Sequence, residues 1–110
     1  MIGPSDVRAA AALLDGVVTR TPVLRSRVLS ELIGTDVWLK CENLQRTGSF
    51  KIRGAYTRLS RMSDEQKAHG VVAASAGNHA QGVALAAQML GIEAVVFMPE
   101  DAALPKVSAT

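Results

Sequence analysis

The chain has 110 residues, 48% hydrophobic and 20% charged, which is the composition of a folded domain rather than of a disordered chain. Its net charge is only +2 with scattered basic residues, which argues against a nucleic-acid-binding surface, and no apolar run is long enough to cross a membrane. The single cysteine cannot form an internal disulfide and the N-terminus has no signal-like pattern, so we expect a cytoplasmic protein.

The first third of the chain is predicted to contain two short helices joined by an extended segment. Ser5 is expected to cap a helix that stops before Gly16. Ser26 is expected to cap a second helix, which Gly34 closes. Between the helices, Pro22 restricts the residue before it to extended backbone.

Residues 36–42 alternate between apolar and polar side chains, which predicts a strand. Val37, Leu39 and Cys41 would form one strongly buried face of this strand. Residues 43–48 follow as a polar loop.

The remainder of the chain alternates helices and apolar strands. A helix is predicted from Ser49 to about Met62, with an apolar stripe at Ile52, Ala55, Tyr56 and Leu59. The later elements are a short helix with a capping box at 63–66, a strand at 71–74, a tight turn at 75–78 followed by a helix to about 90, a strand at 94–98 and a helix that opens at 105. Both late strands are continuous apolar runs, so we expect them to be buried on both faces. Strand, helix, strand, helix, strand predicts an α/β fold with a parallel sheet flanked by helices.

One candidate site is the segment Thr47–Ala55, with Lys51 in the first turn of a helix. A cation there opposes the positive end of the helix dipole, so the position favours a neutral amine, the form that attacks a carbonyl carbon. Phe50 beside it offers a flat ring that can support a planar cofactor. The alternative is that Lys51 is an ordinary solvated lysine near a helix start.

A second candidate site is the segment 75–82, where a buried strand turns into a helix. Ligands bind at such turns in α/β proteins, and free amides at the helix N-terminus suit a carboxylate or phosphate. The alternative is an ordinary turn with Asn78 as N-cap. The segment lacks a G-x-G-x-x-G pattern, and Val83 stands where a P-loop requires lysine.

His79 and Ser75 do not suggest a metal site or a hydrolase. His69 is the only other histidine and Cys41 the only cysteine, so too few ligands are present for zinc. No carboxylate near His79 in the sequence would support a general base, and Ser75 is not in a G-x-S-x-G turn.

Four segments in this order and spacing resemble the fold-type II pyridoxal-phosphate enzymes. They are Thr21–Val23, Trp38–Gln45, Gly48–Ala55 and Ser75–Gly82. The sequence Ile52-Arg53-Gly54 after the lysine and the loop Ser-Ala-Gly-Asn-His are similar to threonine dehydratase and serine racemase, and differ from cysteine synthase and threonine synthase.

The resemblance implies a role for each site residue. Lys51 would hold pyridoxal phosphate as a Schiff base and act as the catalytic base. Phe50 would pack against the pyridine ring and Asn78 would hydrogen-bond the phenolic oxygen. The substrate carboxylate would bind at Ser75, Ala76, Gly77, Asn78 and His79, and no metal is implied.

The implied reaction is deamination of L-threonine to 2-oxobutanoate and ammonia, with L-serine giving pyruvate. In many bacteria this is the first step of isoleucine synthesis. Two alternatives stay open: a serine racemase, and a non-catalytic remnant that acts only by association.

The resemblance also implies an incomplete enzyme. Residues 1–110 correspond to an N-terminal segment plus most of the smaller domain of the tryptophan synthase β-like fold. The larger domain, with the glycine-rich loop that holds the cofactor phosphate, would lie beyond Thr110. The complete enzyme is expected to be a homo-oligomer that binds neither nucleic acid nor membranes.

Overall fold

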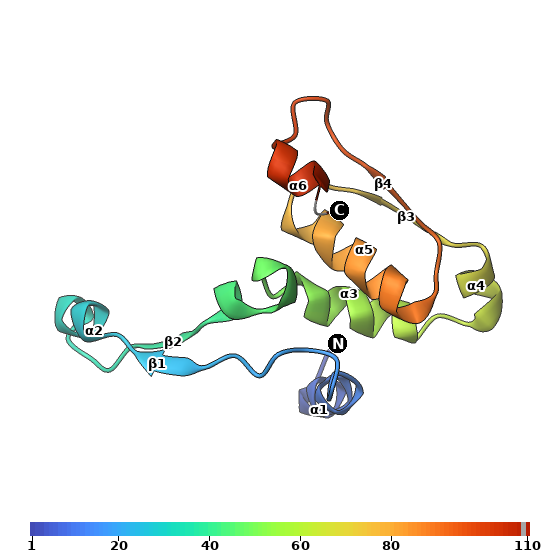
Figure 1. Cartoon of the computed structure of the whole chain (residues 1–110). Coiled ribbons are helices and arrows are strands. Elements are labelled where there is room, and N and C mark those ends of the chain that lie inside the picture. The colour runs from blue at the N-terminus through green and yellow to red at the C-terminus, as the bar shows by residue number, and fades with distance from the viewer. Residues whose placement is uncertain (109) are drawn as a thin grey trace.

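The helices and strands follow the predicted order in the computed structural model, which describes residues 1–108 and 110 (Figure 1). In chain order they are α1 (Pro4–Leu13), β1 (Val23–Arg25), α2 (Arg27–Ile33), β2 (Trp38–Lys40), α3 (Lys51–Ser60), α4 (Asp64–Ala68), β3 (Val71–Ala74), α5 (Asn78–Leu90), β4 (Ala94–Phe97) and α6 (Leu104–Ser108). The loop predicted at 43–48 contains two 3₁₀ turns, η1 (Glu42–Leu44) and η2 (Arg46–Gly48).

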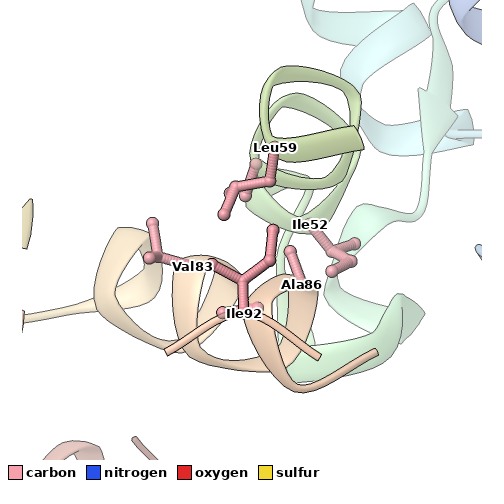
Figure 2. Packing of buried hydrophobic residues seen from close by; sticks show 7 residues of the cluster. Ile52, Leu59, Val83, Ala86 and Ile92 are labelled. Atoms are coloured by element: carbon pink, nitrogen blue, oxygen red, sulfur yellow. The ribbon is translucent and has the colours of Figure 1, made fainter. Parts of the chain in front are cut away.

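The hydrophobic core lies between α3 and α5, which run side by side (Figures 1 and 2). The predicted apolar stripe of α3 is confirmed: Ile52, Ala55 and Leu59 are buried, and Tyr56 packs against them. From α5, Val83 and a run of alanines face this stripe, which allows the two helices to approach closely. Ile92, just after α5, closes the cluster.

The predicted parallel pairing is confirmed for β3 and β4, so the chain is an α/β protein. The two strands pair in parallel from Val71 with Ala94 to Ala74 with Phe97, and α5 is the crossover helix between them. Residues of one sheet face pack on the core cluster, and they are Val71, Ala73 and Ala94.

The prediction that these two strands are buried on both faces is wrong. On the second face Val72 is 73% exposed and Phe97 64% exposed. Their apolar composition therefore reflects one covered face and one face over which the described residues place no helix or strand. Parallel sheets are ordinarily covered on both faces.

The strand predicted at 36–42 does not join the parallel sheet. It is shortened to β2, which pairs antiparallel with β1, and Glu42 already belongs to a 3₁₀ turn. The expected buried face is also wrong, since Leu39 is 44% exposed and Trp38, on the other face, 59%. The strand's hydrogen bonds are made within a thin arm, β1-α2-β2, that projects away from the α3–α5 core (Figure 1).

This arm makes the molecule elongated. The Cα radius of gyration is 16.5 Å, with extents of 51 × 39 × 26 Å. A compact domain of this length would have a radius of about 13 Å. None of the helices among residues 1–108 and 110 has the length and apolarity needed to cross a bilayer.

Most of the helix ends read from the sequence are confirmed. The Ser26 hydroxyl accepts a hydrogen bond from the Leu29 amide, and Gly34 ends α2 in the left-handed conformation. Ser63 and Gln66 form the predicted capping box. Gly91 ends α5 with a φ of 65°.

The predicted cap of the first helix is wrong. The N-cap is Gly3, two residues before Ser5, and Pro4 takes the first helical position, where its missing N–H costs nothing. The Asp6 carboxylate accepts a hydrogen bond from the Gly3 amide at 2.8 Å and so fixes the earlier start.

The core packing gives a matched pair of variants. Ile52 is fully buried and Ile33, at the end of α2, is 61% exposed. We expect Ile52→Val to lower the free energy of unfolding by about 0.5–1.5 kcal/mol, because it removes one methylene from a filled core. Ile33→Val should change it by less than about 0.5 kcal/mol. Urea denaturation followed by circular dichroism measures both, and equal effects would contradict the α3–α5 core.

Candidate active site

Lys51 lies in the first turn of α3, as predicted, although the helix begins at Lys51 itself rather than near Ser49, directly after the loop that contains η2. Ser49 is buried, and its hydroxyl accepts a hydrogen bond from the Lys51 amide at 3.4 Å. The Lys51 ammonium lies over the ring of Phe50, with Nζ 5.1 Å from the ring centroid. Phe50 itself is 58% exposed, so a flat face of its ring is available beside the amine.

The second predicted segment forms a loop between β3 and α5. Ser75 extends the sheet ladder, since its amide donates to the Phe97 carbonyl at 3.0 Å. Its hydroxyl then accepts hydrogen bonds from the amides of Gly77 and Ala80, both at 3.3 Å. The side chain of Ser75 therefore caps α5, a role that the sequence left open for Asn78.

This arrangement leaves donors free at the start of α5. Gly77 is the N-cap residue and Asn78 the first residue of the helix. Within the described part of the chain, the backbone N–H groups of Ala76, Asn78 and His79 have no acceptor. Amides at a helix N-terminus together carry partial positive charge, so they can bind a carboxylate or phosphate.

The packing of α5 on α3 brings the two predicted segments together. Gly82, one turn into α5, is buried against the backbone of Lys51. A β-carbon at position 82 would lie 3.0 Å from both C and Cβ of Lys51, and 3.2 Å from the nitrogen of Ile52. A side chain at position 82 would therefore press on the start of α3, so the glycine sets how closely Lys51 approaches α5.

An ion pair on the arm side of α3 holds the same helix. The Arg53 guanidinium donates from Nε and Nη2 to the two carboxylate oxygens of Glu42, both at 2.8 Å. The Thr21 hydroxyl donates to Glu42 Oε1 at 2.6 Å. The hydrogen bonds from Arg53, with a smaller contribution from Thr21, lower the pKa of Glu42 to about 2 against the opposing effect of burial. The same pairing raises the pKa of Arg53.

A groove of about 880 Å³ lies elsewhere, between α1 and α3. Residues such as Val7 of α1, Leu14 just after it, and Gly54 and Arg58 of α3 line it. Neither Lys51 nor the 75–79 loop contributes to this groove, so it is separate from the predicted site.

Among residues 1–108 and 110, no three His, Cys, Asp or Glu side chains lie close enough to hold a metal ion. His79 is exposed at the start of α5. The groups that the site does offer are an amine, an aromatic ring, an amide side chain and free backbone N–H groups. This set fits a planar aldehyde that carries a phenolic oxygen, together with an amino-acid carboxylate, as pyridoxal-phosphate chemistry requires.

The sequence of residues 14–110 matches the family model described as pyridoxal-phosphate-dependent enzyme. The chain belongs to this family. The match includes Lys51 and the whole of the 75–82 segment, so the family resemblance inferred from those residues is confirmed.

The curated relatives that match include two ammonia-lyases and a dehydratase. An L-threonine ammonia-lyase of Thermotoga maritima is 56% identical over the whole chain, which covers 27% of that protein. An L-threo-3-hydroxyaspartate ammonia-lyase of a Pseudomonas species is 56% identical over 96% of the chain and 33% of its own length. A catabolic L-threonine dehydratase of Staphylococcus aureus is 50% identical over the whole chain and 32% of its own length.

Solved structures show the same fold. Maize serine racemase superposes with a TM-score of 0.87 at 43% identity, covering 94% of this chain and 31% of that one. A threonine deaminase from T.th. superposes with a TM-score of 0.83 at 44% identity, covering 98% of this chain and 33% of that one. The chain therefore spans about a third or less of the length of the relatives that it matches.

Sequence reasoning missed several residues that build the site. Gly82 stood in a quoted motif, but its approach to Lys51 depends on helix packing that no local pattern reveals. Glu42 and Arg53 also stood in quoted motifs, 11 positions apart, and an ion pair between them was not predicted. Gln45 was placed in a polar loop, yet its buried side chain bonds both the N–H and the carbonyl of Thr19.

Thr47 was also passed over. Its φ of 64° places a β-branched residue in the left-handed region, and its buried hydroxyl has no partner within the described residues. This strained residue turns the loop sharply just before Ser49, and the packing of η2 beside α3 and α5 maintains it.

The glycines of the two helices give a second matched pair. We expect Gly82→Ala to lower the free energy of unfolding by about 1 kcal/mol or more, because overpacking outweighs the better helix propensity of alanine. Gly54→Ala should raise it by about 0.5–1 kcal/mol, because open space surrounds Gly54 within 4 Å. Urea denaturation measures both, and amide chemical shifts should report displacement of Lys51 in Gly82→Ala alone. Stabilisation by Gly82→Ala would show that the close approach does not constrain α3.

The Glu42 carboxylate gives a pH prediction. Its pKa is lowered from 4.5 to about 2 in the folded chain, so folding is stabilised while the carboxylate is ionised. This contribution is complete well above pH 4.5 and is lost as the pH falls through about 2. We expect the stability difference between wild type and Glu42→Gln to be constant near neutral pH and to shrink between pH 4.5 and 2. Urea denaturation across this range checks it, and a difference independent of pH would contradict the ion pair.

Proposed function

We propose that this chain is the lysine-bearing part of a pyridoxal-phosphate-dependent threonine/serine ammonia-lyase. The observation that carries the proposal is the position of Lys51: the first turn of α3, held against Gly82 and next to a loop with free amides. The names of the threonine ammonia-lyase and threonine deaminase relatives support the choice of reaction.

Each predicted residue has a proposed role that its surroundings support. Lys51 holds the cofactor through Nζ and, once released, takes the proton from Cα of the amino acid. Phe50 presents its exposed ring to the pyridine ring. Asn78 donates to the phenolic oxygen of the cofactor.

The loop from Ser75 to His79 binds the substrate carboxylate. The free amides of Ala76, Asn78 and His79 would donate to its oxygens, and the Ser75 hydroxyl holds the loop in shape. When bound, pyridoxal phosphate supplies a conjugated ring that takes up the electron pair left at Cα. Loss of the β-hydroxyl as water would leave an unsaturated amine, and its hydrolysis by a second water molecule would give 2-oxobutanoate from threonine, or pyruvate from serine, and ammonia.

The domain assignment is also a proposal. Residues 1–110 would form an N-terminal segment plus most of the smaller domain, and a larger domain would supply the loop for the cofactor phosphate. Two observations support this assignment: the outer face of the β3–β4 sheet is exposed, and the chain covers only a small part of each relative's length. We further propose a cytoplasmic homo-oligomer for the complete enzyme.

A second candidate is serine racemase, because maize serine racemase has the same fold over 94% of this chain. The name of the Pseudomonas relative gives a further β-hydroxy amino acid, L-threo-3-hydroxyaspartate, as the substrate of that protein. Assays of the complete enzyme separate these activities: 2-oxo acid from threonine, serine or hydroxyaspartate supports a lyase, and D-serine without 2-oxo acid supports the racemase.

The metabolic role follows from the product. The 2-oxobutanoate formed from threonine would enter isoleucine synthesis, and the name of the staphylococcal relative indicates breakdown of threonine for that protein. Growth on medium that lacks isoleucine, by a strain whose threonine deamination depends on the complete enzyme, tests this role.

Covalent trapping tests the role of Lys51. After addition of pyridoxal phosphate and reduction with borohydride, we expect the cofactor's mass on the Lys51 peptide. Lys51→Arg keeps the positive charge but has no amine to form the link, so this label should be lost entirely. Lys67→Arg, in α4, should leave the label unchanged. No label on the wild-type chain, or equal labelling of surface lysines, would support the non-catalytic remnant instead.

A further inference from the structure

Lys106 of α6 reaches across to the first turn of α5, and neither the sequence motifs nor the family match single it out. Its ammonium donates hydrogen bonds to Asn78 Oδ1 and, at 3.1 Å, to Gln81 Oε1. Asn78 and Gln81 are three positions apart, so they lie on the same face of α5 and one cation can bridge them. Figure 1 shows α6 beside the N-terminal end of α5.

The chemistry of lysine fixes the orientation of the Asn78 amide. An ammonium has three donors and no acceptor, so it bonds only the oxygen of an amide group. Because Oδ1 of Asn78 is turned towards Lys106, its NH₂ group is turned away and is left to donate elsewhere. An asparagine held in this way suits an oxygen that bears negative charge, such as a phenolate.

The bond to Gln81 shows why Lys106 is itself held in place. Gln81 is only 7% exposed, and a buried amide oxygen without a donor is strongly unfavourable. Lys106 supplies that donor from α6. Asn78, in contrast, is exposed, so without Lys106 its amide would be free to rotate.

We propose that Lys106 is a positioning residue that orients the Asn78 amide for donation to the cofactor's phenolic oxygen. The donation rests on the function proposed above, whereas the orientation rests only on contacts within this chain. Lys106 acts through Asn78 and takes no part in bond making. Its positive charge next to Asn78 also favours the anionic form of the oxygen that receives the hydrogen bond.

NMR of the cofactor-free chain tests the orientation. The side-chain NH₂ of exposed Asn43 serves as the internal reference for a mobile amide. In the wild-type chain we expect the Asn78 NH₂ to show a larger heteronuclear NOE than that of Asn43. In Lys106→Met the value for Asn78 should fall to that of Asn43, and Lys106→Arg, which also only donates, should preserve it. Lys67→Met is the matched control and should leave Asn78 unchanged.

Two outcomes of this experiment would overturn the proposal. One is a wild-type Asn78 amide as mobile as that of Asn43, a result that needs no variant to fold. The other is an Asn78 amide that stays ordered in folded Lys106→Met.

Cofactor binding provides the second measurement and separates the two proposals. Removal of Lys106 should weaken pyridoxal phosphate binding by at least about tenfold, the loss expected for one hydrogen bond to a charged atom. Lys106→Arg should recover most of it. An ordered Asn78 in a wild-type chain that takes up no cofactor would refute the proposed function of this chain while supporting the orientation of Asn78 by Lys106. Equal affinity in wild type and Lys106→Met, with Asn78 mobile in the latter, would refute the role of Lys106 in cofactor binding.

Discussion

The close approach of α5 to α3 at Gly82 is the constraint on which the site depends. The helices approach most closely where α5 has no side chain, and this position lies opposite the backbone of Lys51. The alanines of α5 and the buried face of α3 extend the same contact along both helices. The core that stabilises the fold and the placement of the candidate nucleophile are therefore one feature.

Polar interactions hold the side of α3 that does not pack on α5. On the arm side, the Glu42–Arg53 pair and the Thr21 hydroxyl connect the start of the helix to the segment after β2. The side chain of Gln45 joins the following loop to Thr19 through two hydrogen bonds with the Thr19 backbone. Lys51 thus projects from a helix held by apolar packing on one side and by a partly buried ion pair on the other. Catalytic groups need this kind of support from the residues around them.

Much apolar surface remains uncovered in this chain. Trp38 in the arm and Val72 and Phe97 on the outer sheet face are each more than half exposed. Domains ordinarily bury such faces in a second layer of structure. The relatives are about three times longer, which supports the proposal that the complete enzyme contributes that layer.

Local sequence was sufficient for the elements and for the identity of the candidate residues. The caps at Ser26 and Ser63, the stripe on α3 and the motif around Lys51 depend on neighbours within a few positions, so a linear pattern contains them. The prediction errors arose where a segment distant in the sequence determines the pairing or burial of a residue. Residues 36–42 were predicted to form a buried strand of the parallel sheet, because an alternating pattern does not reveal which strand will be the partner. In the structure the partner is β1.

Tertiary structure alone decided how the candidate residues act together. The sequence placed a lysine at one helix start and an amide loop at another, 24 or more positions apart, and gave no distance between them. Packing at Gly82 brought the two segments into contact, the side chain of Ser75 rather than that of Asn78 accepted an amide at the start of α5, and Lys106 turned the Asn78 amide. Each of these depends on atoms far apart in the chain, because helix packing and side-chain hydrogen bonds form across space, whereas caps and periodicity form along the backbone.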